Sequence, residues 1–319
     1  MWFKNLTVYR FTKPFDLSAE QIEGKLATGE FHPCGKLQPF SIGWVPPLGI
    51  EQPRFLFSTG NYHMVCLRKQ ERVIPSSVVR EAMEERMAVL QAESGRKLRS
   101  KERAALRDEI MLDLLPRAFT RSSNRYAYIA PKDNLIVVDT ASAKSAEELI
   151  GQLRVQLGSL PVEPFAPETA ANAIFTRWVQ GNDVPSDITL GDECELRDLS
   201  EDGAIARCRR QALDADEVQG HLVSGKRTVK LAIEWADTLN CVLDESLTVR
   251  RVRFSDRILD ETDNSNEDPT ALFDADFVLM TAELARFIRR LEEIFGAPKL
   301  AAKEKAEPNL KLYNEVETA

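Results

Sequence analysis

The sequence is poor in the residues that build metal centres and disulfide frameworks. Its 319 residues include only three histidines and five cysteines, and no two of these stand at a spacing typical of a metal site. The cysteines are odd in number and scattered, which predicts reduced thiols in a cytoplasmic protein. We therefore expect no bound metal and no cofactor. The cysteines are Cys34, Cys66, Cys194, Cys208 and Cys241.

Long apolar runs are also missing. The longest are only a few residues, such as Leu135–Val138, so no segment is expected to span a membrane. The start of the chain, Met1–Asn5, has no apolar segment of the kind found in a signal peptide, which again favours the cytoplasm. With 15 glycines and 16 prolines, the composition excludes collagen-like and low-complexity chains, and 43% hydrophobic residues allow a buried core.

Catalytic motifs are absent or incomplete. The segment Gly220–Arg227 is close to a phosphate-binding loop, but Arg227 occupies the position where such a loop needs Ser or Thr to hold magnesium. A Gly-x-Ser-x-Gly elbow for a hydrolase nucleophile does not occur. Carboxylates cluster between Asp256 and Asp276 and could hold Mg²⁺ in a nuclease. We favour the simpler reading, an acidic loop followed by a buried strand at Phe277–Met280.

The patterns that are present predict an α+β fold with antiparallel sheets. In the first half we expect strands at residues 2–11, 54–58 and 62–69, a helix capped by Ser18, and a stiff turn at residues 43–49. Residues 76–115 are dense in helix formers and predict two helices, 76–94 and 100–115, which project from the sheet. A strand hairpin at 125–129 and 135–140 follows, with a helix from Ser145 to Leu157.

Pro161, Pro164 and Pro167 predict an irregular segment and a domain boundary. Beyond it the pattern indicates further strands, a helix capped near residue 214 and a final helix. The expected strands are 194–199, 204–211, 227–235, 238–243 and 248–254, and the expected helices are 215–224 and 282–295. The predicted domains are residues 1–75 with 116–160, an inserted helical projection at 76–115, a second α+β domain at 161–300, and a disordered tail at 301–319.

The net charge is −8, yet basic residues are concentrated in three groups. Residues 96–125 contain nine basic and four acidic side chains, so this segment alone carries +5. Alternation along a strand places Arg207 and Arg209 on one face, and likewise Arg251 and Arg253. Such segregation predicts one basic surface suited to phosphate contacts. The second group is Arg207, Arg209, Arg210, Lys226, Arg227 and Lys230, and the third is Arg250, Arg251, Arg253 and Arg257.

Several short blocks occur in order over nearly the whole chain: Trp2–Leu6, Pro33–Gly35, Gly43–Pro47, Leu114–Phe119, Ala141–Lys144, Leu157–Pro161 and Phe273–Phe277. In these blocks the sequence resembles the bacterial recombination-associated RdgC family. The resemblance implies a ring-shaped homodimer that binds double-stranded DNA without sequence preference, is associated with the nucleoid, and restrains RecA recombinase filaments.

The resemblance also suggests roles for individual residues. Phe119 matches an aromatic residue at the gate contact of the dimer, Arg210 and Gln211 match a Lys-Gln pair near DNA, and Lys226 matches a basic position. The residues that we expect to contact DNA are Lys97, Arg99, Lys101, Arg103, Arg117, Arg121, Arg209, Arg210, Gln211, Lys226 and Arg227.

Two alternatives to a non-enzymatic DNA-binding protein stay open at this point. One is a Mg²⁺-dependent nuclease that uses the carboxylates of residues 256–276. The other is an interaction module that contacts the recombinase directly through the Arg-rich helix.

Overall fold

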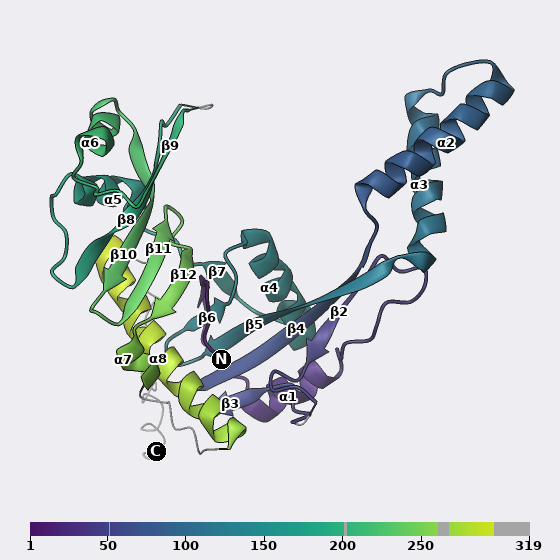
Figure 1. Ribbon diagram of the computed structural model, residues 1–319. Coiled ribbons are helices and arrows are strands. Elements are labelled where there is room, and N and C mark those ends of the chain that lie inside the picture. Colours follow the sequence, from purple (N-terminus) through teal and green to yellow (C-terminus); the bar gives the residue numbers. More distant parts are fainter. Residues whose placement is uncertain (51, 201–202, 261–267, 297–319) are drawn as a thin grey trace, which may run out of the picture.

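The protein is described by a computed structural model that covers residues 1–50, 52–200, 203–260 and 268–296 (Figure 1). Two antiparallel sheets with helices packed on them confirm the α+β class. The molecule is an open crescent, with a helical arm at one end and the tip of the second sheet at the other (Figure 1). None of the helices in the described ranges is long and apolar enough to cross a bilayer.

The first sheet has the strand order β2-β4-β5-β6-β1-β7, and β3 pairs with β4. Two helices cover one face, α1 (Ala19–Ala27) and α4 (Ala143–Leu157), and bury Ile22, Leu26, Leu149 and Leu153. Helix α1 begins with the predicted capping box at Ser18. The strands are β1 (Thr7–Phe11), β2 (Phe40–Val45), β3 (Phe57–Thr59), β4 (Tyr62–Val73), β5 (Phe119–Ala130), β6 (Leu135–Val138) and β7 (Val162–Pro164).

The second sheet has the order β12-β11-β10-β8-β9. Its strands are β8 (Ile188–Arg197), β9 (Ile205–Arg209), β10 (Arg227–Trp235), β11 (Leu239–Asp244) and β12 (Val249–Phe254). Three helices, α5 (Ala171–Val179), α6 (Asp216–Val223) and α7 (Asp256–Leu259), lie beside it. Leu231, Ile233 and Trp235 alternate along β10 and point into the core, so Lys230 and Glu234 point to the opposite, open face.

The long helix α8 (Pro269–Phe295) connects the two sheets through one apolar core. Phe277 and Met280 on this helix are fully buried in the same cluster as Tyr128 of the first sheet and Trp235 of the second. The Trp235 and Phe287 rings lie 5.3 Å apart. One helix therefore sets the position of the second sheet relative to the first.

The arm is the part of the fold that the sequence predicts best. Helices α2 (Ser76–Ser94) and α3 (Ser100–Leu114), followed by a short 3-10 turn at Leu115–Arg117, stand between β4 and β5 as expected. Their contact is small, with Val79, Leu106 and Ile110 buried between them. The ladder of β4 and β5 runs from His63↔Ile129 to Val73↔Phe119 and carries the arm away from the body (Figure 1).

Several local predictions are wrong. Phe277–Met280 is helical, because this apolar run belongs to α8, where Phe277 and Met280 pack into the core shared by both sheets and Val278 is exposed. Residues 43–45 continue strand β2 instead of forming the turn, and the Pro-rich segment contains strand β7. The helix expected from Ser145 is capped by Ser142, and α6 has no side-chain cap, contrary to its predicted capping box.

Other elements differ in extent or were not expected. Helix α5 was not predicted, β1 begins at Thr7 rather than at residue 2, and β8 begins at Ile188 rather than at 194. The tail at 301–319 and part of the acidic loop, residues 261–267, lie outside the described residues. The division into domains stays a prediction.

Candidate nucleic-acid interface

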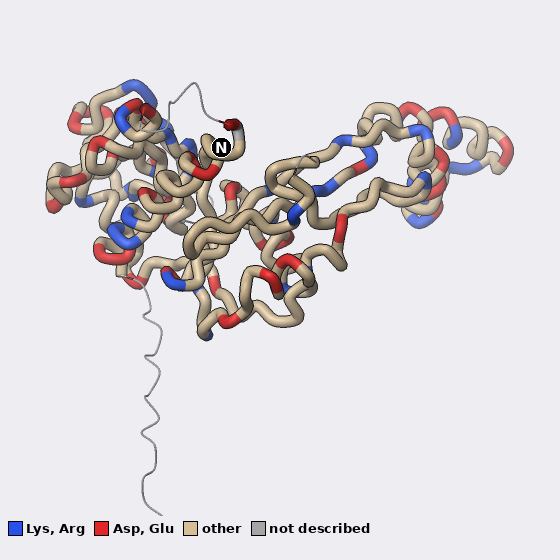
Figure 2. Tube along the Cα trace, turned by 90° about the horizontal axis from the view of Figure 1, so that it is seen from below, with Lys and Arg blue, Asp and Glu red and all other residues tan. Residues whose placement is uncertain are grey.

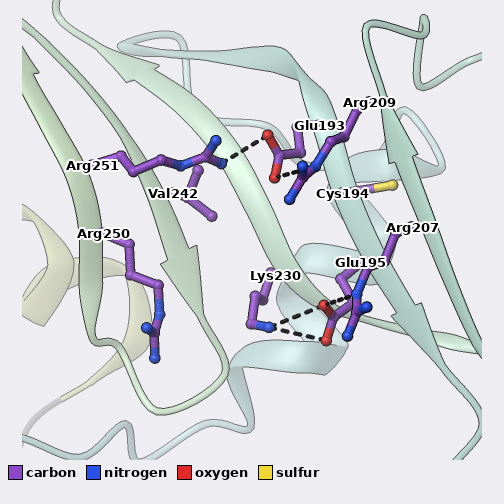
Figure 3. Close-up of a pocket in the computed structure, with 9 residues that line it drawn as sticks. All are labelled: Glu193, Cys194, Glu195, Arg207, Arg209, Lys230, Val242, Arg250 and Arg251. Atoms are coloured by element: carbon purple, nitrogen blue, oxygen red, sulfur yellow. Dashed lines mark hydrogen bonds and ion pairs between the residues drawn. The ribbon is translucent and has the colours of Figure 1, made fainter. Parts of the chain in front are cut away.

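The open face of the second sheet carries a group of charged side chains around a shallow depression of about 230 Å³ (Figure 3). Five basic residues and two glutamates line it, and we call this set the cationic face. It consists of Arg207, Arg209, Lys230, Arg250 and Arg251 with Glu193 and Glu195. The face therefore joins members of the second and third basic groups of the sequence.

Strand register brings these residues together. On β8 and β9, Glu193 lies opposite Arg209 and Glu195 lies opposite Arg207. On the other side of β8, Lys230 of β10 is paired with Glu195. Because side chains two residues apart share one face of a strand, each glutamate faces the arginine opposite it on β9, and Glu195 also faces Lys230 on β10.

Strand β12 contributes two adjacent arginines through an irregularity in its pairing. In a regular strand Arg250 and Arg251 would point to opposite faces. The register with β11 shifts between Asn240 and Val242, and Arg251 has a positive φ of 53°. This bulge lets both Arg250 and Arg251 line the depression. Arg251 and Arg253 are both exposed, whereas Val252 and Phe254 are buried, as the expected alternation requires.

Each glutamate of the cationic face forms ion pairs with two of its basic side chains (Figure 3), and Glu195 also lies 4.0 Å from Arg197. Lys230 donates to both carboxylate oxygens of Glu195 at 3.0 Å, and the Arg207 Nε donates to Glu195 at 2.9 Å. Glu193 lies 2.7 Å from an Arg251 nitrogen and 3.4 Å from the Arg209 Nε. Basic groups thus outnumber the carboxylates that they surround.

The carboxylates lie deeper than the basic groups. The Glu195 side chain is 10% exposed, whereas those of Arg207 and Arg209 are 63% and 69% exposed. Burial alone would raise the pKa of Glu195, but the hydrogen bonds from Arg207 and Lys230 hold it below its usual value. Glu195 is therefore ionised at neutral pH, and the guanidinium groups are what an approaching anion meets first.

The other predicted DNA-contacting residues occupy separate places. Arg210 and Gln211 follow β9 at the Glu193 end of the cationic face, where Gln211 donates to Glu217 at 3.3 Å. Lys226 and Arg227 lie at the opposite end, and Arg227 is paired with Arg197 across β10 and β8. These four residues thus flank the cationic face without lining it.

A second basic region lies where the arm leaves the body. Arg117 and Arg121 stand at the start of β5, and Arg121 is largely exposed, 3.5 Å from Glu71. Basic residues mark the two long strands in this region, whereas acidic and basic residues are mixed over the helices (Figure 2). Between these arginines lies Phe119, whose side chain is 88% exposed.

The predicted basic residues of the arm lie at its far end, in the link between α2 and α3 and in the first turn of α3. They are Lys97, Arg99, Lys101 and Arg103. Acidic residues offset the charge here, since Glu102 binds Arg96 at 2.6 Å and Arg86 binds both Glu109 and Asp113. A single chain does not unite the arm, the arm base and the cationic face into one surface (Figure 1).

Comparison with known proteins gives the same family over the whole described chain. A family model described as "Putative exonuclease, RdgC" matches residues 1–298. The proteins named Recombination-associated protein RdgC from Aeromonas hydrophila and Pseudoalteromonas atlantica are 44% and 40% identical over 297 residues, 93% of this chain and 98% of each relative. That from Tolumonas auensis is 39% identical over 300 residues, 94% of this chain and 99% of the relative.

The chain belongs to the RdgC family. This membership agrees with the resemblance seen in the short sequence blocks. The relatives are named for an association with recombination, and the fold of this chain has a cationic sheet face. Of the residues that sequence reasoning proposed as DNA contacts in this RdgC chain, Arg209 alone lines the cationic face. Arg207, Lys230, Arg250 and Arg251 were noted only as members of basic groups, and the signal that could have selected them was their alternation along strands.

The two glutamates of this RdgC chain were missed altogether. Glu193 and Glu195 lie in the segment Gly191–Asp198, which contains both acidic and basic residues, and nothing local shows that basic side chains from three other strands converge on them. Only the register of the folded sheet reveals that they form the base of the cationic face.

Proposed function

We propose that this protein binds double-stranded DNA without sequence preference, as a ring-shaped homodimer, and modulates recombination by restraining RecA filaments without catalysing a reaction. The observation that carries the proposal is the cationic face, an excess of exposed basic side chains in a chain whose net charge is −8. Family membership adds the link to recombination.

The chemistry of the cationic face favours phosphate over bases. Arginine and lysine on a sheet face can contact the sugar-phosphate backbone, which positions a protein on DNA but carries no direct sequence information. Each neutralised phosphate releases condensed counterions, so affinity should fall steeply with salt. The acidic remainder of the surface repels DNA and keeps binding on the basic side.

The shape of the molecule supports the ring. Exposed apolar side chains occur at both ends of the crescent, and each end would be covered if a second copy met it by two-fold symmetry. At the arm these are Val89, Leu112 and Phe119, and at the tip of the second sheet they are Leu199, Ile205 and Val223. Two such contacts would close the open side of the crescent into a hole (Figure 1).

Occupation of duplex DNA is sufficient to explain an effect on recombinase. A protein that covers or encircles the duplex competes for the same backbone that a RecA filament must engage, and no bond needs to be broken. A nuclease would instead depend on carboxylates near residues 256–276. Of these, residues 261–267 lie outside the described ranges, and the described residues contain no group of three or more His, Cys, Asp or Glu that could hold a metal ion.

The test is fluorescence anisotropy of two unrelated labelled duplexes against salt concentration. We expect similar affinities for both duplexes and a steep negative slope of log affinity against log salt, about −0.9 for each phosphate contact. No binding at low salt, or a flat slope, would refute the proposal. Cleavage of supercoiled plasmid in Mg²⁺ or Mn²⁺ would show a nuclease instead.

A matched pair of variants locates the interface. Arg209→Ala removes an exposed arginine of the cationic face, and Arg177→Ala removes an exposed arginine of α5 that is paired with Asp183 at 3.2 Å. Both lower the net charge equally. We expect only Arg209→Ala to reduce the salt slope, by about one.

A further inference from the structure

The cationic face contains two carboxylates, and their spacing along β8 resembles that of phosphates along a DNA strand. Glu193 and Glu195 are two residues apart on β8, so their Cα atoms are about 6–7 Å apart by the rise of a strand, and their side chains lie on one face. Successive phosphates of one DNA strand rise by 3.4 Å along the axis, and the winding of the helix brings their separation to about 6–7 Å as well. Each carboxylate forms ion pairs with two basic side chains of the face, as a bound phosphate would.

We propose that Glu193 and Glu195 act as internal stand-ins for two successive phosphates, which hold the basic side chains of the cationic face in place and weaken its affinity for DNA. The inference rests on the proposed function and adds a control of affinity to the same site. The two glutamates are thus positioning residues that act through the arginines and the lysine.

The hydrogen bonds show how a phosphate can enter. Arg207 and Arg209 reach their glutamates through Nε. A guanidinium has five N–H donors, and within the described chain the terminal nitrogens of these two arginines have no other hydrogen-bond partner. These nitrogens remain available to an acceptor that arrives from solvent, above the buried carboxylates. DNA can therefore bind a set of basic groups whose orientation is already fixed.

The ion pairs of the two glutamates also reduce the attraction between the cationic face and DNA. The positive charge of Lys230 is already paired with both oxygens of Glu195. In addition, every carboxylate in the depression repels the incoming phosphate. Without DNA the glutamates relieve repulsion among four of the five neighbouring basic groups, which stabilises the sheet, whereas the fifth, Arg250, is paired with Asp244 at 2.9 Å. With DNA they compete with the backbone, which lowers affinity.

The experiment compares Glu195→Gln and Glu193→Gln with the wild-type chain by anisotropy of a labelled duplex across a salt series. Each variant removes a negative charge from the depression while keeping the side-chain shape. We expect binding at low salt to become about five- to tenfold tighter and the salt slope to become steeper by about one, because one or two more basic groups then contact phosphate. Glu195→Asp keeps the charge and should bind like the wild type.

The matched control is Asp187→Asn. Asp187 also binds basic and polar groups, Arg290 at 2.8 Å and the Trp235 indole at 3.0 Å, but lies away from the cationic face. Its replacement changes the net charge by the same amount. If it tightens DNA binding as much as Glu195→Gln does, the effect is one of net charge and the proposal is wrong.

The remaining outcomes separate this proposal from the proposed function. If the wild-type chain binds DNA and the two Gln variants bind equally well or more weakly, the glutamates are not competing anions, although DNA binding stands. If the wild-type chain does not bind DNA, both are refuted. Should Glu195→Gln fail to fold, Glu193→Gln gives the same test at a carboxylate that is less buried.

Discussion

At the scale of single residues, Phe119 is unusual because it is a large apolar side chain in an ordered strand and is 88% exposed. An exposed residue contributes little to the stability of its own chain, since it leaves water only when a partner covers it. We expect Phe119→Ala to change the free energy of unfolding by no more than about 0.5 kcal/mol. Retention on DNA should fall much more, because in the proposed ring Phe119 contacts the second copy.

The measurements are thermal unfolding and the dissociation rate from duplex DNA. Val155→Ala, which removes another exposed apolar side chain from the middle of the molecule, serves as the control and should change neither. An equal loss of stability and retention in Phe119→Ala, or no loss in either, would contradict a role for Phe119 between subunits.

His63 gives a prediction about pH. Its ring lies half-buried beside Ser58, with 2.9 Å between the hydroxyl and Nδ1. Burial lowers the pKa of His63 below the ordinary value of 6.5, although the charge of Glu20 acts in the opposite direction. A histidine whose folded pKa is depressed stabilises the fold fully above pH 6.5, and that contribution is lost as the pH falls through the folded pKa.

Urea unfolding at pH 7.5 and 5.5 tests this prediction. The wild-type chain should lose more stability between the two pH values than His63→Gln, which has no charge to gain on acidification. A variant with the same pH dependence as the wild type would exclude His63 as a source of acid sensitivity.

At the scale of elements, the arm depends on one side chain at its base. Arg72 on β4 donates to the carbonyl oxygens of Leu115 and Ala118 at 3.2 and 3.1 Å, and also to that of Gly35. It therefore ties the end of α3 and the start of β5 to the body. The helices themselves bury only a few apolar side chains against each other, so the main other restraint on the arm is the ladder of β4 and β5, which ends at Val73↔Phe119.

We expect Arg72→Ala to cost about 1–3 kcal/mol of stability, because several carbonyls lose a charged donor. Hydrogen exchange should accelerate in residues 115–120 while the second sheet is unaffected. Arg68→Ala is the matched control, since Arg68 lies on the same strand and its Nε donates to Asn124. Equal exchange in both variants would show that Arg72 does not fix the arm.

The elements also show where sequence reasoning succeeds and where it fails. The arm was predicted because its signals are local: helix formers at helical spacing, a glycine at the turn and a proline after the second helix. Helix α8 was only half predicted, because Phe277–Met280 is apolar even at the exposed Val278, so the run has no polar residue to show its helical period. Strand β7 is short and depends on pairing with β1, which is distant in sequence.

The candidate site was predictable in composition but not in arrangement. Basic groups in an acidic chain indicated a phosphate-binding surface. Which residues form it depends on the register between β8, β9 and β10 and on the bulge at Arg251, and none of these is encoded by a local pattern. The glutamates beneath Arg207 and Arg251 belong to the same long-range arrangement.

At the scale of the whole molecule, a ring that encloses the duplex should behave differently from a protein that only contacts the DNA backbone. A protein that only rests on the duplex dissociates when salt screens its contacts, whatever the form of the DNA, because the screening length is about 8 Å at physiological salt. A closed ring cannot leave a circular duplex without opening an interface, but it can slide from a linear end. We therefore expect longer retention on nicked circular DNA than on the linearised form after transfer to high salt.

Surface-immobilised DNA of the two forms, with protein release followed after the salt step, provides the measurement. Blocking both ends of the linear DNA with a bulky protein should restore the retention seen on the circle, whereas Phe119→Ala should shorten retention on the circle by weakening the gate. Equal release from the circle and the open linear form would exclude a closed ring. The cationic face would then account for binding by contact with one side of the duplex, and the exposed apolar ends of the crescent would need another partner.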